Sequence, residues 1–222
     1  MLYTNQQIGR INKIIIAIIF LIGWVALIGQ LYLILLNRKL SIPETILQYF
    51  SYFTILSNLL VTIACTVLLF KPTSTVGKFF YKPTTLTALT VYITIVGLVY
   101  NVILRFLWAP QGLQKLVDEL LHTVMPLLFI TYWFIYVPKS SLKWNKVYLW
   151  LLFPLIYCIY ILLRGALTGL YPYPFIDVRT LGYNNVFINI ALLVIAFLFT
   201  GLFFIGIGKL SSKIYLKTNK LH

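Results

Sequence analysis

The sequence predicts an all-α integral membrane protein, a single compact bundle of six transmembrane helices over residues 1–222, with both termini in the cytoplasm. Hydrophobic residues make up 61% of the chain and charged residues only 10%, which is more apolar surface than a soluble domain of this length could bury. Many Trp and Tyr residues lie near the ends of apolar stretches, where the membrane interface suits their amphipathic rings. Crossing a hydrocarbon core of about 30 Å takes roughly 20 helical residues. Stretches of that length lie near 14–36, 46–70, 85–108, 118–137, 147–168 and 184–208.

The first three predicted helices differ in how they end and in the polar residues they carry. The run 14–36 is followed by the sequence NRK, without the small-residue pattern of a cleavage site, so we expect a retained helix and not a signal peptide. The helix 46–70 begins with YFSYFTILSN, whose polar side chains need partners in hydrocarbon. The helix 85–108 places Asn101 and Arg105 four residues apart, on one face near its outer end.

The last three predicted helices include the one that carries His122, the only histidine apart from the C-terminal His222. His122 lies in the sequence DELLHTVMP of the helix 118–137. The helix 147–168 brings Arg164 to its outer end, and the loop YPYPFIDVR that follows could lie over that end as a lid. Glycines near the end of the helix 184–208 would allow association within the membrane, so the oligomeric state stays open.

The distribution of charge predicts which side of the membrane each loop faces. The net charge of +14 is spread over loops and chain ends and does not form one basic surface, so no nucleic-acid partner is expected. The side of the termini carries Arg10, Lys13, Lys71, Lys78, Lys82, Lys139, Lys143, Lys146, Lys209, Lys213, Lys217 and Lys220. The other side carries Arg38, Lys39, Arg105, Lys115, Arg164, Arg179 and the acids Glu44, Asp118, Glu119 and Asp177. The positive-inside rule therefore puts both termini in the cytoplasm, with basic loops facing anionic membrane lipids. The abundance of Ile, Lys, Asn and Tyr suggests a bacterial cell membrane.

Thr54 and His122 are expected at similar depths near the outer face. Thr54 would lie roughly 12 Å below the start of the second helix, at 1.5 Å per residue. Taken singly, a membrane threonine usually bonds a carbonyl one turn back, and a single histidine more often makes structural hydrogen bonds. Asp118 and Glu119 precede His122 by four and three residues, so either can fix the imidazole tautomer. Pro126 lacks the N–H that would bond the His122 carbonyl, which predicts a kink there.

Three stretches, YFTILSNLLV, LLHTVMPLLF and GLYPYPFIDV, together resemble a known six-helix membrane family. That family includes the androgen-induced gene product and the androgen-dependent regulator of tissue factor pathway inhibitor. Its members are threonine hydrolases that cleave fatty acid esters of hydroxy fatty acids. The resemblance covers the chain in helix number and order, and its specific points are the Thr, the His four residues before a Pro, and the Tyr-Pro-Phe after the fifth helix. It implies that Thr54 is the nucleophile and His122 its partner.

The residues then support a specific hypothesis for hydrolysis of an acyl lipid. A hydroxyl is a poor nucleophile until a base removes its proton, so His122 would deprotonate Thr54. Asp118, favoured over Glu119 by its i, i+4 spacing, would orient the ring; this third member is inferred from spacing and not from the resemblance. Ser57 or Asn58 would donate to the oxyanion. Arg105 or Arg164 would hold a lipid carboxylate or phosphate, and Asn101 and Tyr173 complete the substrate-binding candidates.

Other function classes remain open or are disfavoured. A non-enzymatic binder of lipids or small molecules, or a transporter, could use the same outer pocket, although proline breaks occur only in two adjacent helices and do not suggest inverted repeats. No metal or other cofactor is expected, because the chain lacks the two-His spacing of zinc hydrolases, a Gly-rich phosphate loop and a CxxC motif. The partners expected are an ester-bearing lipid and the surrounding membrane lipids.

Overall fold

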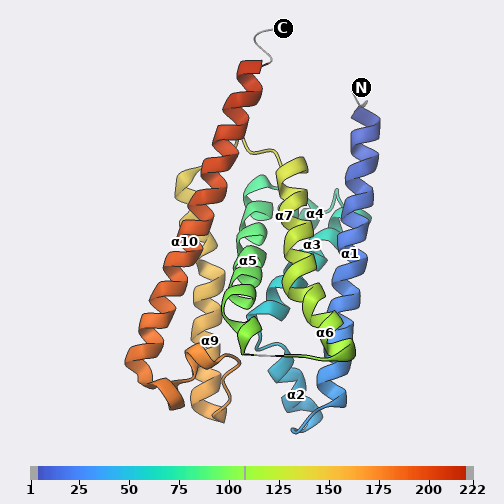
Figure 1. Ribbon diagram of the computed structural model, residues 1–222. Coiled ribbons are helices and arrows are strands. Elements are labelled where there is room, and N and C mark those ends of the chain that lie inside the picture. Colours follow the sequence, from blue (N-terminus) through green and yellow to red (C-terminus); the bar gives the residue numbers. More distant parts are fainter. Residues whose placement is uncertain (1–4, 108, 219–222) are drawn as a thin grey trace. The chain divides into compact units, whose positions relative to one another are not determined.

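The computed structural model describes residues 5–107 and 109–218, and this part of the chain contains helices and turns but no strand (Figure 1). Six helical segments in it are long and apolar enough to cross a membrane, which confirms the predicted fold class. Their bounds are Ile11–Leu36, Phe53–Phe70, Pro83–Phe106, Gly112–Tyr136, Trp144–Thr168 and Val178–Ser211. The chain is therefore a multi-pass membrane protein by the length and composition of its helices.

The helices pack into two compact units. The first comprises Met1–Phe50 and Thr54–Pro138, and the second comprises Ser51–Phe53 and Lys139–His222. The organisation as one domain over 1–222 stays a prediction.

The first unit contains most of the helices in the described part of the chain. In order these are α1 (Asn5–Leu36), α2 (Ile42–Tyr49), α3 (Phe53–Phe70, whose first residue belongs to the second unit), α4 (Thr75–Phe80), α5 (Pro83–Val102), the 3₁₀ turn η1 (Leu104–Phe106), α6 (Gly112–Glu119), the π-helical turn η2 (Leu120–Val124) and α7 (Met125–Tyr136). The starts of the short helices follow from local sequence. Ser41 and Glu44 form a capping box at α2, and Ser74 accepts a hydrogen bond from the backbone N–H of Gly77 at α4. Capping thus lets the chain turn between the long helices.

The second predicted helix, 46–70, is broken in the structure, and this corrects the prediction. Helix α2 ends at Tyr49 and α3 begins at Phe53. At this break the Tyr157 hydroxyl donates a hydrogen bond to the Ser51 carbonyl at 2.9 Å. Thr54 therefore lies in the first turn of α3, and not roughly 12 Å inside a continuous helix.

The other predicted helices also differ from the structure at their ends or interiors, since α1 begins before residue 14 and α5 ends at Val102. The helical segment predicted at 118–137 starts earlier, at Gly112, and its end at Tyr136 agrees. The predicted helix 147–168 consists of α8 (Val147–Trp150) and α9 (Leu152–Thr168). The last, α10 (Val178–Thr218), extends beyond 184–208 at both ends, with Gly182 at φ 73° inside it. A positive φ is strained for L side chains, so the bend falls on glycine. The predicted end at residue 108 lies outside the described residues.

The second unit is held together largely by aromatic contacts. Besides α8, α9 and α10 it contains the 3₁₀ turns η3 (Trp144–Lys146) and η4 (Pro174–Ile176). The Phe53 ring packs against three other rings, with centroids 5.0–5.6 Å apart: Phe153, Tyr157 and Phe197. Asp177 accepts a hydrogen bond from the backbone N–H of Arg179 at 3.0 Å and so begins α10. The three ring contacts of Phe53 involve no charged side chain.

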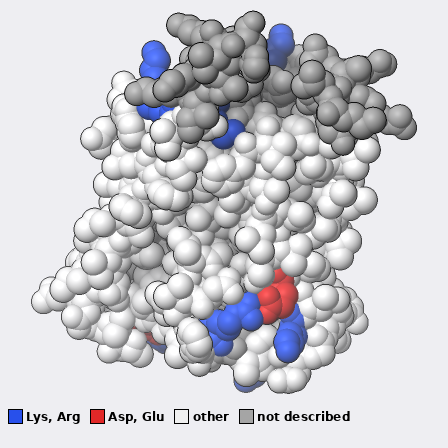
Figure 2. Space-filling view, turned by 45° about the horizontal axis from the view of Figure 1, so that its top comes forward, with Lys and Arg blue, Asp and Glu red and all other residues white. Residues whose placement is uncertain are grey.

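In the view of Figure 2, charged side chains form small groups, and one of these groups contains both acidic and basic residues. Many large apolar side chains, among them Leu167 and Phe199, are exposed in the structure. Exposed apolar side chains of this size suit contact with lipid.

Candidate functional site

The π-helical turn η2 places His122 at an irregular point of the membrane helix formed by α6, η2 and α7. The Met125 N–H donates to the Leu120 carbonyl, five residues back. Pro126 has no N–H, so the carbonyls of Leu121 and His122 lose the donor that another residue would supply at this position. Where the sequence predicts a kink, the structure has a single π-helical turn, a feature often found at functional sites.

Two asparagines on other helices donate hydrogen bonds to these carbonyls. Asn58 Nδ2, on α3, donates to the Leu121 carbonyl at 3.1 Å and to the Thr54 carbonyl at 2.9 Å. Asn101 Nδ2, on α5, donates to the His122 carbonyl at 3.3 Å. Satisfied carbonyls matter because an unpaired polar group is costly in hydrocarbon. The two asparagines therefore tie η2 to both neighbouring helices.

Gly97 allows the close approach of α5 to this turn. A Cβ atom added at Gly97 would lie 3.2 Å from Pro126 Cβ and 3.4 Å from the His122 carbonyl oxygen. Since the first of these distances is tighter than ordinary packing, a side chain there would push α5 away from η2.

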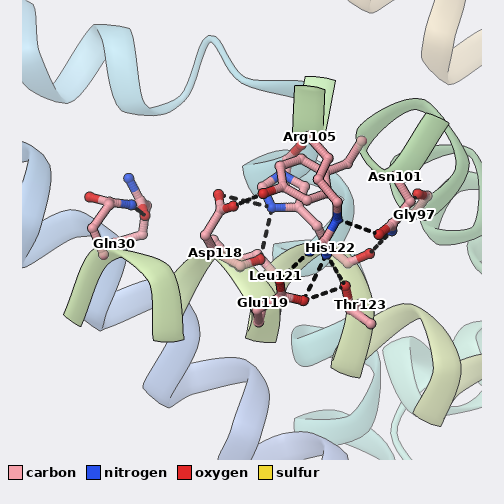
Figure 3. Close-up of polar contacts among 12 residues, drawn as sticks. Gln30, Gly97, Asn101, Arg105, Asp118, Glu119, Leu121, His122 and Thr123 are labelled. Atoms are coloured by element: carbon pink, nitrogen blue, oxygen red, sulfur yellow. Dashed lines mark hydrogen bonds and ion pairs between the residues drawn. The ribbon is translucent and has the colours of Figure 1, made fainter. Parts of the chain in front are cut away.

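His122 is held in a defined orientation by Asp118, one turn earlier on the same helix (Figure 3). His122 Nδ1 lies 2.9 Å from the Asp118 backbone oxygen and 3.2 Å from its carboxylate Oδ1. A backbone carbonyl only accepts, so Nδ1 carries the hydrogen and Nε2 has the lone pair in the neutral ring. Among the described residues Nε2 has no hydrogen-bond partner, and 13% of the His122 side chain is exposed. This is the geometry of an oriented base.

Tyr100, on α5, contacts both members of this pair. Its hydroxyl donates to Asp118 Oδ2, and its ring stacks on the imidazole with centroids 4.0 Å apart and planes 15° apart. Tyr100 and Asp118 are both buried. We call Tyr100, Asp118 and His122 the histidine cluster.

A second group of polar residues lies beside the first. Arg105 forms a bidentate pair with Glu119, at 2.6 and 2.8 Å, and its Nε donates to Asn101 Oδ1 at 2.9 Å. The Thr123 hydroxyl donates to Glu119 Oε2 at 2.8 Å. We call Asn101, Arg105, Glu119 and Thr123 the arginine cluster. Its guanidinium fork is taken by Glu119, so a lipid carboxylate would have to compete for it.

The predicted residues of α3 are buried near η2. Thr54 is 7% exposed, and Ser57 and Asn58 are fully buried. Because Asn58 Nδ2 bonds both carbonyls, the backbones of Thr54 and Leu121, the neighbour of His122, lie close together. Both amide hydrogens of Asn58 are thereby used, which leaves none for an oxyanion. The Ser57 hydroxyl has no hydrogen-bond partner among the described residues.

The two remaining predicted residues, Arg164 and Tyr173, belong to the second unit. Arg164 Nη1 donates to the Leu170 carbonyl at 3.2 Å. The Tyr173 ring stacks on Phe175, with centroids 5.1 Å apart, and meets the Tyr52 ring edge-on. Both side chains therefore help to order the loop between α9 and α10.

Sequence reasoning missed Tyr100 and Thr123. Tyrosine near a helix end suggests an interface anchor, and threonine in a membrane helix suggests a bond to its own backbone. The signal for Tyr100 was its place next to Asn101 at the outer end of the third predicted helix, facing the only predicted helix with two acids.

No protein-family model matches the chain, and no match is found among curated proteins or solved structures. Within the described residues, no group of three or more His, Cys, Asp and Glu side chains could hold a metal ion. The function must therefore be argued from the site.

Proposed function

We propose that the protein is a membrane-embedded lipid ester hydrolase in which Thr54 is the nucleophile and His122 the general base. The observation that carries this proposal is the imidazole of His122, whose Nδ1–H is bonded to Asp118 while Nε2 has no hydrogen-bond partner among the described residues. A positioned nitrogen with a free lone pair is what proton abstraction requires. The substrate class is a fatty acid ester of a hydroxy fatty acid or a related acyl lipid, as the family resemblance suggests.

The first half of the reaction acylates the enzyme. His122 Nε2 takes the proton of the Thr54 hydroxyl as its oxygen attacks the ester carbonyl carbon. The tetrahedral intermediate collapses, the bond to the alcohol oxygen breaks, and His122 gives its proton to that oxygen. The products are an acyl ester of Thr54 and the free hydroxy lipid. Support for this pairing comes from Asn58, which joins the first turn of α3 to the residue before His122.

The second half returns the enzyme to its starting state. His122 takes a proton from water, and the hydroxide attacks the acyl carbonyl. The Thr54 oxygen leaves and recovers its proton from His122, which releases a carboxylic acid. The Ser57 hydroxyl is our candidate oxyanion donor, since Asn58 has no amide hydrogen left. Asp118 holds the imidazolium that forms in each half.

We further propose that the protein lies in a bacterial cell membrane with both termini in the cytoplasm. The larger share of Lys and Arg on the side of the termini supports this orientation. The acyl chain of the substrate would then enter from the outer leaflet and lie against leucine, isoleucine and phenylalanine side chains that the helices expose.

The test is ester hydrolysis by the purified protein in detergent, on a fatty acid ester of a hydroxy fatty acid and on a short fluorogenic ester. Thr54→Ala and His122→Gln should each lower kcat by about 10³-fold or more. The matched control is Thr90→Ala on α5, which removes another buried threonine hydroxyl, one that donates to the Leu86 carbonyl at 2.8 Å. This control should keep wild-type turnover. Absence of turnover by the wild type, with lipid still bound, would favour a binding protein instead.

A further inference from the structure

We infer that Tyr100 is a positioning residue, which holds the Asp118 carboxylate against His122 and limits rotation of the imidazole. The inference rests on the proposed function for its catalytic consequence. Its structural half, the hold on Asp118 and His122, can be measured without any turnover.

The hydroxyl of Tyr100 fixes one oxygen of the carboxylate. It donates to Asp118 Oδ2, so that Oδ1 is left to face His122 Nδ1 at 3.2 Å. Only 8% of the Asp118 side chain is exposed, so water contributes little to its solvation. Hydrogen bonds within the protein replace the water that a buried carboxylate has lost. Tyr100 supplies such a hydrogen bond to Oδ2.

The ring of Tyr100 acts separately from its hydroxyl. It lies nearly parallel to the imidazole, with 4.0 Å between centroids and 15° between planes. Rotation of the imidazole out of its present plane would collide with this ring, which is itself buried. Stacking therefore keeps Nε2 in one direction while Asp118 fixes the tautomer at Nδ1.

Tyr100 also connects the histidine cluster to the arginine cluster. The Arg105 guanidinium carbon lies 5.0 Å from the centroid of the Tyr100 ring. The same guanidinium is fixed by Glu119 and Asn101. A cation held over the ring adds to the forces that keep the tyrosine in place.

The experiment separates the two roles with Tyr100→Phe, which keeps the ring, and Tyr100→Leu, which removes both ring and hydroxyl. We expect kcat to fall about 10-fold in the Phe variant, with KM unchanged, and about 100-fold in the Leu variant. The control is Tyr92→Phe, a buried tyrosine two turns earlier on α5, which should keep wild-type kcat. Wild-type kcat in both Tyr100 variants would overturn the inference.

Carboxyl NMR gives a second readout that does not depend on activity. The chain has only two aspartates, Asp118 and Asp177, so selective ¹³C labelling of aspartate carboxyls gives two signals, which Asp177→Asn assigns. In Tyr100→Phe the Asp118 signal should move and the Asp177 signal should not. An unmoved Asp118 signal would overturn the inference even in an active enzyme. If the wild type does not hydrolyse esters, the proposed function fails, and the NMR result alone decides whether Tyr100 holds Asp118.

Discussion

The histidine cluster and the arginine cluster start from adjacent acids, Asp118 and Glu119, yet they differ in burial and in partners. The Asp118 side chain is 8% exposed and bonded to a tyrosine and a histidine, whereas Glu119 is 31% exposed and paired with Arg105, itself 37% exposed. Half-exposed ion pairs contribute little to stability, while a buried carboxylate next to an imidazole controls its chemistry. Two adjacent positions on one helix, about 100° apart around its axis, thus place one acid in a buried pair and the other in a partly exposed pair.

The largest difference between the clusters should appear in catalysis. Asp118→Asn keeps the shape of the side chain and the backbone carbonyl that Nδ1 bonds, but it removes the carboxylate charge that stabilises the imidazolium. We expect kcat to fall about 10³- to 10⁴-fold, whereas Glu119→Gln should cost less than about 10-fold. Measured rates of ester hydrolysis check this pair of variants. Equal losses in the two variants would remove the distinction between the clusters.

The next effect concerns the two asparagines that donate hydrogen bonds to the backbone carbonyls of η2. Asn58→Ala leaves the buried Leu121 and Thr54 carbonyls without a side-chain donor, and we expect it to lower the free energy of unfolding by about 1–3 kcal/mol. Asn101→Ala should cost about 0.5–1.5 kcal/mol, because Asn101 is half-buried. Chemical unfolding in detergent micelles measures both. A larger loss of unfolding free energy in Asn101→Ala than in Asn58→Ala would show that burial does not determine which of these hydrogen bonds contributes more.

A smaller effect is expected from the ion pair of the arginine cluster. Since both side chains are about one third exposed, Arg105→Gln and Glu119→Gln should each change the free energy of unfolding by about 0–1 kcal/mol. The double variant should lose no more than the sum of the single ones. A loss of several kcal/mol in either single variant would mean that the ion pair contributes as much as a pair shielded from solvent.

The smallest effect is a pH dependence at the start of α10, outside both clusters. The hydrogen bond from the Arg179 side chain holds the pKa of Asp177 below its ordinary value of 3.8. A lowered pKa contributes stability that is present above the ordinary value and is lost as the pH falls through the folded-state pKa. Amide exchange in the first turn of α10 should therefore quicken as the pH is lowered from about 5 toward 2. Asp177→Asn keeps a good cap and should lack this dependence, after correction for intrinsic exchange.

The sequence was sufficient to predict the six membrane helices, because the length of each apolar stretch can be read directly from it. The i, i+4 spacing also brought Asp118 to His122, since contacts one turn apart are local. The break between α2 and α3 was not predictable, because no glycine or proline marks residues 50–52 and the bond that stabilises it comes from Tyr157, about 100 residues away. Arg105 was predicted to bind substrate for a similar reason: its partner Glu119 lies on another helix.

The most direct test of the account is the site of covalent labelling by a fluorophosphonate ester probe, located by mass spectrometry of the digested wild-type protein. We expect one adduct, on Thr54, that is abolished in Thr54→Ala and strongly reduced in His122→Gln. An adduct on another hydroxyl, such as Ser57, or labelling of Thr54 that does not depend on His122, would contradict it.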